Sequence, residues 1–177
     1  MSSKGPQRYK GRLYRGNVFL EKSEAVELIR RGYGRVKRDK ISLSPVEAAY
    51  LAFLGKLSIL ERNRELSFEE LMIKFSSSDP KFLPKFLVYR DLREKGYVVR
   101  EGYSEDIDFL VFDRGDFPER PAKYRVIGVD EGFPIKVGRL MDILDFSSLN
   151  KKELKLAVIE RRGEVVYYTL EIGRAHV

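Results

Sequence analysis

Apolar residues recur with a helical period over residues 81–95, and two strand-like stretches follow directly. The helix would end at Gly96, because glycine readily takes the left-handed conformation that stops a helix. Two strands are predicted at 97–101 and 107–112, joined by a turn rich in glycine, serine and aspartate. The apolar face of the helix is formed by residues at positions i, i+4, i+7 and i+10, namely Phe82, Phe86, Tyr89 and Leu92.

The chain before this helix predicts a first group of shorter elements. Ser44 followed by Pro45 is typical of a helix start, and Ser67 with Glu70 matches a capping box. In order, we expect a strand pair over 12–20 turning at Arg15-Gly16-Asn17, a helix over 24–31 capped by Ser23, a basic connector, a short strand over 41–43, a helix over 45–54 and a helix from 68 to about 75.

The chain after residue 112 predicts a second group of elements with more strand. Alternating apolar residues favour a third strand at 123–129, and a helix is expected within 134–146. A closing hairpin is predicted from strands at 154–160 and 165–172, turning at Arg161-Arg162-Gly163.

A polar stretch at residues 76–80 ends in proline and is predicted to be the linker between two domains. The elements on its two sides predict an α+β fold. A small N-terminal α/β lobe would cover residues 1–78, and a C-terminal mixed β-sheet flanked by helices would cover residues 79–172.

Composition limits the class of protein. The chain has 177 residues, of which 43% are hydrophobic, so it can bury a core without covalent staples. It has no cysteine, which excludes disulfides and thiolate chemistry. No apolar run long enough to span a membrane and no signal-peptide pattern is present, so we expect a cytoplasmic protein without membrane contact. A charged fraction of 34% is compatible with a thermophile.

The last five residues, GRAHV at 173–177, follow a finished strand and are predicted to be a vector-derived tail. They contain His176, the only histidine of the chain. Without this tail the chain has no histidine, which excludes histidine general acid–base chemistry and histidine-ligated metal sites. We therefore predict neither a metal nor a small-molecule cofactor.

Positive charge is concentrated in residues 1–40, which hold twelve Lys and Arg against four Asp and Glu. This excess predicts contact with the phosphates of RNA or DNA, and the alternative is a solvated basic surface. Tyr9, Tyr14 and Tyr33 are interleaved with the charges and would either stack on bases or belong to the core or an interface. The candidate RNA-binding residues are Arg12, Arg15, Arg35, Lys37, Arg38 and Lys40.

Several segments resemble one known family when taken in series. The stretch YRDLREKGYVVREG with DFLVFDRG resembles the start of the C-terminal domain of the archaeal tRNA-splicing endonucleases, also called tRNA-intron endonucleases. LSPVEAAYLAFLGKLSIL at 43–60 resembles the family's N-terminal helix, and KLAVIERRGEVVYYTLEI at 155–172 its closing hairpin. The resemblance covers most of residues 40–172 in the right order, and it implies the fold of that family.

The resemblance also implies a metal-free reaction. In this family a tyrosine takes the proton of a ribose 2′-hydroxyl that attacks the adjacent phosphate, a histidine protonates the leaving 5′-oxygen, and a lysine stabilises the phosphorane charge. The products carry 2′,3′-cyclic phosphate and 5′-hydroxyl ends. Aligned on these motifs, the chain has Phe112 at the tyrosine position and Pro121 at or next to the histidine position, and Lys152 is the closest candidate for the lysine.

Because Phe112 and Pro121 cannot transfer protons, the resemblance implies a non-catalytic structural subunit, the β-type chain of a heteromeric enzyme. Its partners would be a homologous catalytic subunit, in an α2β2 heterotetramer, and precursor tRNA. The final strand, rich in apolar and aromatic residues, would pair along a dimer edge. An acidic loop would dock the opposing subunit, at 104–108 or at Asp130-Glu131. The candidate interface residues are Val165, Val166, Tyr167, Tyr168, Leu170, Glu105, Asp106 and Asp108.

Two other classes of protein remain open from the residues alone. A metal-dependent nuclease would use carboxylates with a lysine on a small sheet, and the candidates are Asp106, Asp108, Glu131 and Glu160. A free-standing basic RNA-binding protein would explain the N-terminal charge but would leave the final strand without a partner.

Overall fold

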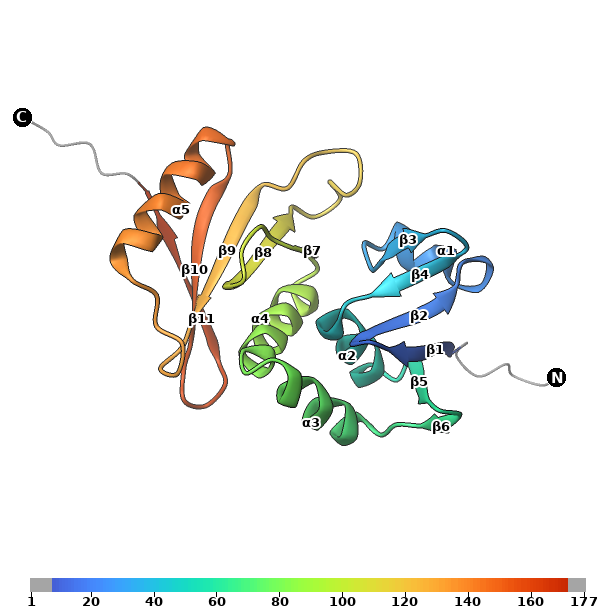
Figure 1. Ribbon diagram of the computed structural model, residues 1–177. Coiled ribbons are helices and arrows are strands. Elements are labelled where there is room, and N and C mark those ends of the chain that lie inside the picture. The colour runs from blue at the N-terminus through green and yellow to red at the C-terminus, as the bar shows by residue number, and fades with distance from the viewer. Residues whose placement is uncertain (1–7, 172–177) are drawn as a thin grey trace, which may run out of the picture. The chain divides into compact units, whose positions relative to one another are not determined.

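The computed structural model describes residues 8–171 (Figure 1), so the expected tail at 173–177, with His176, lies outside the described residues. The chain divides into two compact units, one up to Phe86 and the other from Leu87. Helices and mixed sheets occur in both units, and the predicted α+β fold is confirmed. In the described part of the chain, no helix is long and apolar enough to cross a membrane.

The first unit is built on a six-stranded sheet in the order β3-β4-β2-β1-β5-β6. Neighbouring strands are antiparallel except β1 and β5, which are parallel. The turns between β1 and β2 and between β3 and β4 are two residues long, with positive φ at Arg15, Gly16 and Arg38. The strands are β1 (Tyr9–Tyr14), β2 (Asn17–Glu21), β3 (Arg35–Lys37), β4 (Lys40–Leu43), β5 (Leu57–Glu61) and β6 (Arg64–Glu65).

One face of this sheet forms the core of the first unit. Helix α1 (Lys22–Arg30) contacts β2, β3 and β4, and helix α2 (Pro45–Phe53) contacts β2 and β5. Helix α3 (Phe68–Ser78) contacts α2. The backbone of Gly11 approaches this core closely, since a Cβ there would lie 2.5 Å from Val18 Cγ1. The buried strand residues are Val18, Leu20, Ile41, Leu43, Leu57 and Ile59.

Buried Glu47 ties the start of α2 to the loop before β3. Its carboxylate accepts hydrogen bonds from the backbone N–H of Ser44 at 3.0 Å and of Gly34 at 2.6 Å. Gly34 has a φ of 75°, and a Cβ there would lie 2.8 Å from Ile41 Cγ2. The predicted start of α2 at Ser44-Pro45 is therefore confirmed, and the same carboxylate orients a second segment.

Four local predictions for the first unit were wrong. Helix α1 begins at Lys22, so Ser23 lies inside the helix and is not its cap. The basic connector contains strand β3, and the stretch after α2 is strand β5 and not part of the family's helix. Helix α3 continues to Ser78, so the first three residues of the expected linker at 76–80 are helical.

The second unit is built on a five-stranded sheet in the order β11-β10-β9-β8-β7. Strands β9 and β10 are parallel and the other neighbours are antiparallel. The predicted strands and closing hairpin are confirmed within one or two residues. They are β7 (Val98–Glu101), β8 (Ile107–Phe112), β9 (Tyr124–Val129), β10 (Glu153–Ile159) and β11 (Val165–Leu170).

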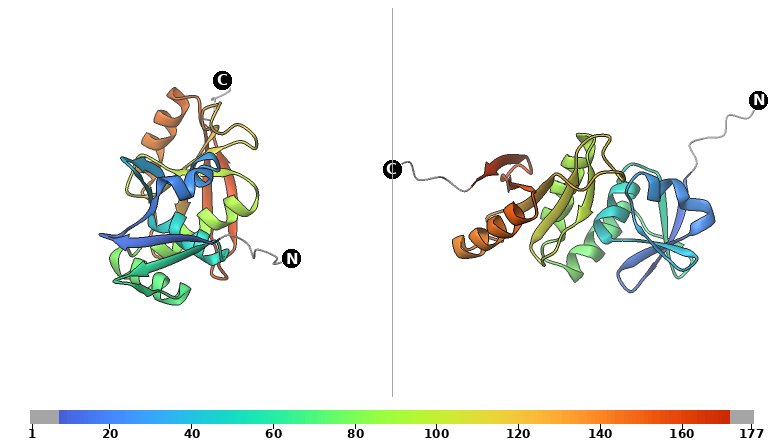
Figure 2. Two further views of the ribbon diagram at one scale, coloured as in Figure 1. Left: turned by 90° about the vertical axis from the view of Figure 1, so that its right-hand side faces the viewer. Right: turned by 90° about the horizontal axis from the view of Figure 1, so that it is seen from above.

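Helices α4 (Phe82–Glu94) and α5 (Val137–Leu149) lie on opposite faces of this sheet (Figure 2). From α4, Tyr89 packs on Phe109 of β8 with ring centroids 5.9 Å apart. The predicted helix at 81–95 is thereby confirmed. Helix α5 was expected within 134–146; it begins inside this range but ends three residues beyond it, at Leu149. It covers a buried cluster formed by Ile127, Ile143, Leu144 and Leu154.

Candidate active-site edge and subunit interface

One end of the second sheet brings together the three positions that the family resemblance aligns with catalytic residues. Strand β8 ends there, while β9 and β10 begin there, because Val111 pairs with Tyr124 and Tyr124 with Glu153. Two backbone bonds of 3.0 Å extend this pairing outward, from Lys123 N–H to the Val111 carbonyl and from Glu153 N–H to the Lys123 carbonyl. Phe112, Pro121 and Lys152 therefore come from three segments that meet at one edge.

The side chains at this edge have a different chemistry from that of a ribonuclease centre. Lys152 donates from Nζ to the carbonyl of Ala122 at 3.2 Å, which holds its ammonium group beside Pro121. The Phe112 ring packs edge-on against Phe117, with centroids 5.1 Å apart. Pro121 is exposed. Lys152 therefore brings a positive charge to this edge, while Phe112 and Pro121 supply neither a general base nor a general acid.

Comparison with protein-family models gives two matches that together cover most of the chain. Residues 9–72 match the tRNA intron endonuclease, N-terminal domain, and residues 82–167 match the tRNA intron endonuclease, catalytic C-terminal domain. The chain belongs to the tRNA intron endonuclease family. Both domains of the family are thus present, in the order and at about the places that the motifs predicted.

Relatives of this tRNA intron endonuclease chain carry the name tRNA-splicing endonuclease. The one from Methanococcus maripaludis is 32% identical over 154 residues, which are 86% of this chain and 87% of the relative. The one from Thermococcus onnurineus is 33% identical over 156 residues, covering 87% and 90%. The one from Methanosarcina acetivorans is 37% identical over 159 residues, but these are 88% of this chain and only 45% of that longer relative.

Strand β11 of this tRNA intron endonuclease chain lies at the edge of its sheet, as the predicted interface requires. Val165, Val166 and Leu170 are half-buried and Tyr168 is 54% exposed. Leu170 packs against the cluster under α5. Tyr167 points to the other face, toward α4, so the side chains of this strand are shared between two faces of the same unit.

Tyr167 anchors the edge strand to α4. Its hydroxyl donates to Asp91 Oδ2 at 2.6 Å, and Lys95 Nζ lies 2.8 Å from the same carboxylate oxygen and 4.5 Å from the Tyr167 ring centroid. Burial, and then the hydrogen bond to Asp91, raise the pKa of Tyr167 far above its ordinary value. The phenol is therefore a permanent donor, and it holds β11 in place.

We expect Tyr167→Phe to lower the free energy of unfolding by about 1 kcal/mol, because one hydrogen bond to a partly exposed carboxylate is lost. Urea unfolding followed by circular dichroism measures this change. Tyr168→Phe is the matched control, since Tyr168 is 54% exposed, and it should leave the midpoint unchanged. Equal midpoints for both variants would show that the Tyr167 hydroxyl contributes nothing.

The three acidic interface candidates in the loop at 104–108 differ in burial. Glu105 is exposed, and Asp106 pairs with Arg139 at 3.2 Å on the surface. The Asp108 side chain is fully buried and pairs with Arg125 at 2.7 Å. The prediction that Asp108 lies in a docking surface conflicts with this burial, because its carboxylate is used inside the unit. Glu105 and Asp106 stay candidates.

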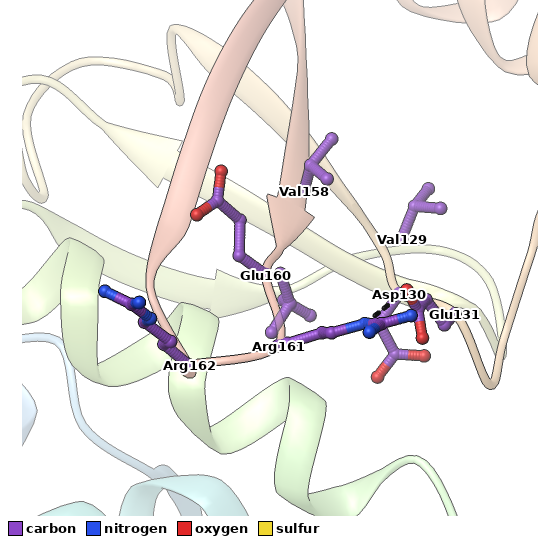
Figure 3. A pocket seen from close by; sticks show the side chains of 8 residues that line it. Val129, Asp130, Glu131, Val158, Glu160, Arg161 and Arg162 are labelled. Atoms are coloured by element: carbon purple, nitrogen blue, oxygen red, sulfur yellow. Dashed lines mark hydrogen bonds and ion pairs between the residues drawn. The ribbon is translucent and has the colours of Figure 1, made fainter.

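The second acidic candidate, Asp130-Glu131, lies against the basic turn of the closing hairpin (Figure 3). Arg161 donates from Nε to Glu131 Oε1 at 3.1 Å, and both side chains are exposed. Asp130 accepts from the backbone N–H groups of Gly132 and Phe133, each at 2.9 Å. These contacts order a shallow hollow at the surface, and an exposed pair of this kind stabilises by less than about 1 kcal/mol.

The carboxylates named for a metal-dependent nuclease do not converge. Asp108 is paired with Arg125, Asp106 with Arg139 and Glu131 with Arg161. Glu160 is exposed in the hairpin turn. Between residues 8 and 171, no three His, Cys, Asp or Glu side chains are grouped so that they could hold a metal ion.

The predicted RNA-binding residues all belong to the first unit, but they occupy two kinds of place. Arg15 and Arg38 stand at the tips of the two-residue turns. Lys40 forms an ion pair with Glu21, and Arg12 donates to Asn63 Oδ1 at 3.2 Å. Apart from the half-buried Lys40, the members of the set are exposed, and strand residues Arg12, Arg35, Lys37 and Lys40 share one face of the sheet.

Proposed function

We propose that this chain is the structural, non-catalytic subunit of a heteromeric tRNA-splicing endonuclease, whose catalytic residues are supplied by a homologous partner chain. The observation that carries the proposal is the chemistry of the edge at β8, β9 and β10. Family membership predicts a tyrosine and a histidine there, and Phe112 and Pro121 stand in their places beside Lys152. The assembly would be an α2β2 heterotetramer that cuts precursor tRNA to 2′,3′-cyclic phosphate and 5′-hydroxyl ends without metal.

The open edge of β11 supports the need for a partner. Glu160 N–H donates to the Glu164 carbonyl at 2.8 Å, so these two residues form a hydrogen-bonded pair. Antiparallel pairs alternate, and the register therefore turns the backbone groups of Val165, Tyr167 and Thr169 away from β10. Among the strands that the structure describes, none pairs with this edge. A strand from another chain would satisfy these groups.

A second candidate function is a free-standing RNA-binding protein. The observation that favours it is the basic sheet face of the first unit, which needs no catalytic partner to bind RNA. It differs from the subunit proposal in one measurable respect, which is whether this chain changes the cleavage activity of a homologue that carries the tyrosine and the histidine.

The deciding experiment is cleavage of an intron-containing precursor tRNA in EDTA by this chain, by a catalytic homologue and by the two together. We expect no cleavage by this chain alone, since loss of general acid–base groups costs roughly 100-fold to 10,000-fold in rate per group. We expect the mixture to cut and to leave cyclic-phosphate ends. A Lys152→Ala variant in the mixture should cut as the unchanged chain does, because catalysis would reside in the partner.

Cleavage by this chain alone would overturn the proposal, because positions 112 and 121 could then not be the missing catalytic groups. A mixture no more active than the homologue alone would favour the free-standing RNA-binding protein. Cleavage that EDTA abolishes and Mg²⁺ restores would instead support the metal-dependent nuclease.

A further inference from the structure

We infer that the face of the N-terminal sheet opposite α1 and α2 binds single-stranded RNA, with bases stacking on Tyr14 and Phe19 and phosphates held by Lys10, Arg12 and Arg62. We call this surface the sheet platform. The inference rests on the proposed function in one respect, since it takes RNA as the class of ligand. It concerns a part of the chain remote in sequence from the edge at Phe112, Pro121 and Lys152.

Strand alternation separates the platform from the core. The buried residues Val18, Leu20, Ile41 and Leu43 point toward the helices, so their neighbours in sequence point to the opposite face. Strand pairing then places one residue from each of the six strands in a single row across this face. This row is Arg35, Ser42, Phe19, Arg12, Leu60 and Glu65.

The platform is hollowed over its central strands. Residues of β1, β2, β4 and β5 and of the turn after β5 line one shallow groove. Two of them are aromatic and four are basic, with a single carboxylate. The lining residues are Lys10, Arg12, Leu13, Tyr14, Phe19, Glu21, Lys40, Leu60 and Arg62.

Two aromatic rings lie where a base could stack. Tyr14 is 59% exposed although it lies in a strand, and its ring centroid is 6.5 Å from that of Phe19 at an interplanar angle of 58°. The Arg15 guanidinium lies 5.3 Å from the Tyr14 centroid. An exposed ring with an arginine beside it is a common arrangement for holding unpaired bases, since every base has a face that can stack.

The charge of the groove selects a polyanion. Glu21 is paired with Lys40, which cancels one positive charge, so Lys10, Arg12 and Arg62 leave the groove with a net positive charge. Arg35 and Lys37 extend the positive surface on β3. Arg12 is oriented by the side chain of Asn63 at 3.2 Å. Phosphates of a strand crossing the platform would meet positive charge on both sides of the aromatic pair.

Single-stranded RNA fits these features better than a duplex does. In an A-form helix the bases are stacked on one another and cannot reach a protein ring, while the phosphates can reach any basic surface. A duplex would therefore use the charges but not Tyr14. Stacking on the two aromatic rings requires unpaired nucleotides on the sheet.

The test measures fluorescence anisotropy of the full chain with a labelled uridine-rich RNA of about 12 nucleotides, a length within the usual footprint of single-strand binders. A duplex RNA of equal length is the comparison. We expect the single strand to bind more tightly, Tyr14→Ala to weaken its binding about tenfold, and Tyr14→Phe to bind as the unchanged chain does. Arg12→Gln should lower the slope of log K against log salt by about 0.7.

Arg30→Gln on α1 is the matched control for charge. Arg30 is exposed, forms a surface ion pair with Glu27 at 3.7 Å, and lies on a helix that packs on the other face of the sheet. It should leave the affinity unchanged. Circular dichroism of each variant shows that the fold is retained.

Equal affinity for single strand and duplex, with no effect of Tyr14→Ala, would overturn the inference and leave a nonspecific basic surface. So would a loss of affinity in Arg30→Gln as large as that in Arg12→Gln. The assay reads binding and not cleavage, so a failure here is distinct from a failure of the reconstitution experiment. If the mixture cleaves precursor tRNA but Tyr14→Ala does not weaken single-strand binding, the subunit proposal stands and the sheet platform is wrong.

Discussion

Asp108→Ala is expected to lower the free energy of unfolding by about 3–5 kcal/mol, because it leaves a buried arginine without its partner. The side chains of Asp108 and Arg125 have 0% and 4% of their surface exposed. Arg125 donates to the carboxylate through Nε at 3.1 Å and Nη2 at 2.7 Å. Such a paired, two-point contact is among the strongest that a carboxylate forms in a protein interior.

The pair is built into its surroundings by further contacts of both side chains. The Asp108 carboxylate also accepts from the backbone N–H groups of Tyr103 at 3.1 Å and Ser104 at 3.0 Å and from the Ser104 hydroxyl at 2.9 Å. The Arg125 guanidinium lies 5.4 Å from the Tyr103 ring centroid and 5.6 Å from that of Phe146. Removing the carboxylate therefore removes the hydrogen bonds that hold Tyr103 and Ser104, and it leaves the cation beside two aromatic rings.

The controls for Asp108→Ala come from the same part of the sheet. Asp106→Ala removes a partly exposed carboxylate paired with the exposed Arg139 and should cost less than about 1 kcal/mol. Asp108→Leu combined with Arg125→Met should recover much of the loss, because apolar residues can replace a buried ion pair as a unit. Denaturant unfolding measures all three. A loss for Asp108→Ala no larger than that for Asp106→Ala would contradict the expectation.

Local signals in the sequence predicted where most elements begin and end. The pairs Ser44-Pro45 and Ser67-Glu70 and the stop at Gly96 act through groups within one turn of themselves, so no long-range information is needed. Strand β5 was missed for the opposite reason. Leu57 and Ile59 follow a helix and pair in parallel with β1, some fifty residues earlier, and no local pattern fixes that pairing.

The candidate sites likewise include contacts that the sequence predicted and contacts that depend on long-range strand pairing. That Phe112, Pro121 and Lys152 meet at one edge followed from the family resemblance, and the strand register explains it. The Asp108–Arg125 pair was missed, although each residue is a charge inside an apolar strand and such a charge requires a partner. The sequence shows that each buried charge needs a partner of opposite charge. Which residue is the partner depends on the register of the strands and on the face to which each side chain points.

Thr169→Pro is expected to weaken binding to the catalytic partner on the order of 100-fold, if that partner pairs with the edge of β11. The N–H of Thr169 points away from β10 by the alternation derived from the Glu160–Glu164 bond. Proline removes this one outward donor and places its ring in the path of the incoming strand. The ladder between β10 and β11 keeps its hydrogen bonds, so the unit itself should remain folded.

Thr169→Val is the matched control, because it keeps the N–H and loses only the hydroxyl that Lys155 contacts at 2.6 Å. We expect it to assemble as the unchanged chain does. Size-exclusion chromatography of the mixed chains measures assembly, and cleavage of precursor tRNA by the mixture should fall to that of the partner alone with Thr169→Pro. Unfolding midpoints of the two variants test whether the proline has disturbed the unit itself.

If Thr169→Pro still assembles and supports cleavage, the edge of β11 is not the interface, and the partner must contact another surface such as the loop with Glu105 and Asp106. If it abolishes assembly while Thr169→Val does not, the outward backbone groups of β11 are the contact. That result would also explain why the strand can be apolar and aromatic at an edge, because in the assembled enzyme it would be an interior strand of a sheet shared by two chains.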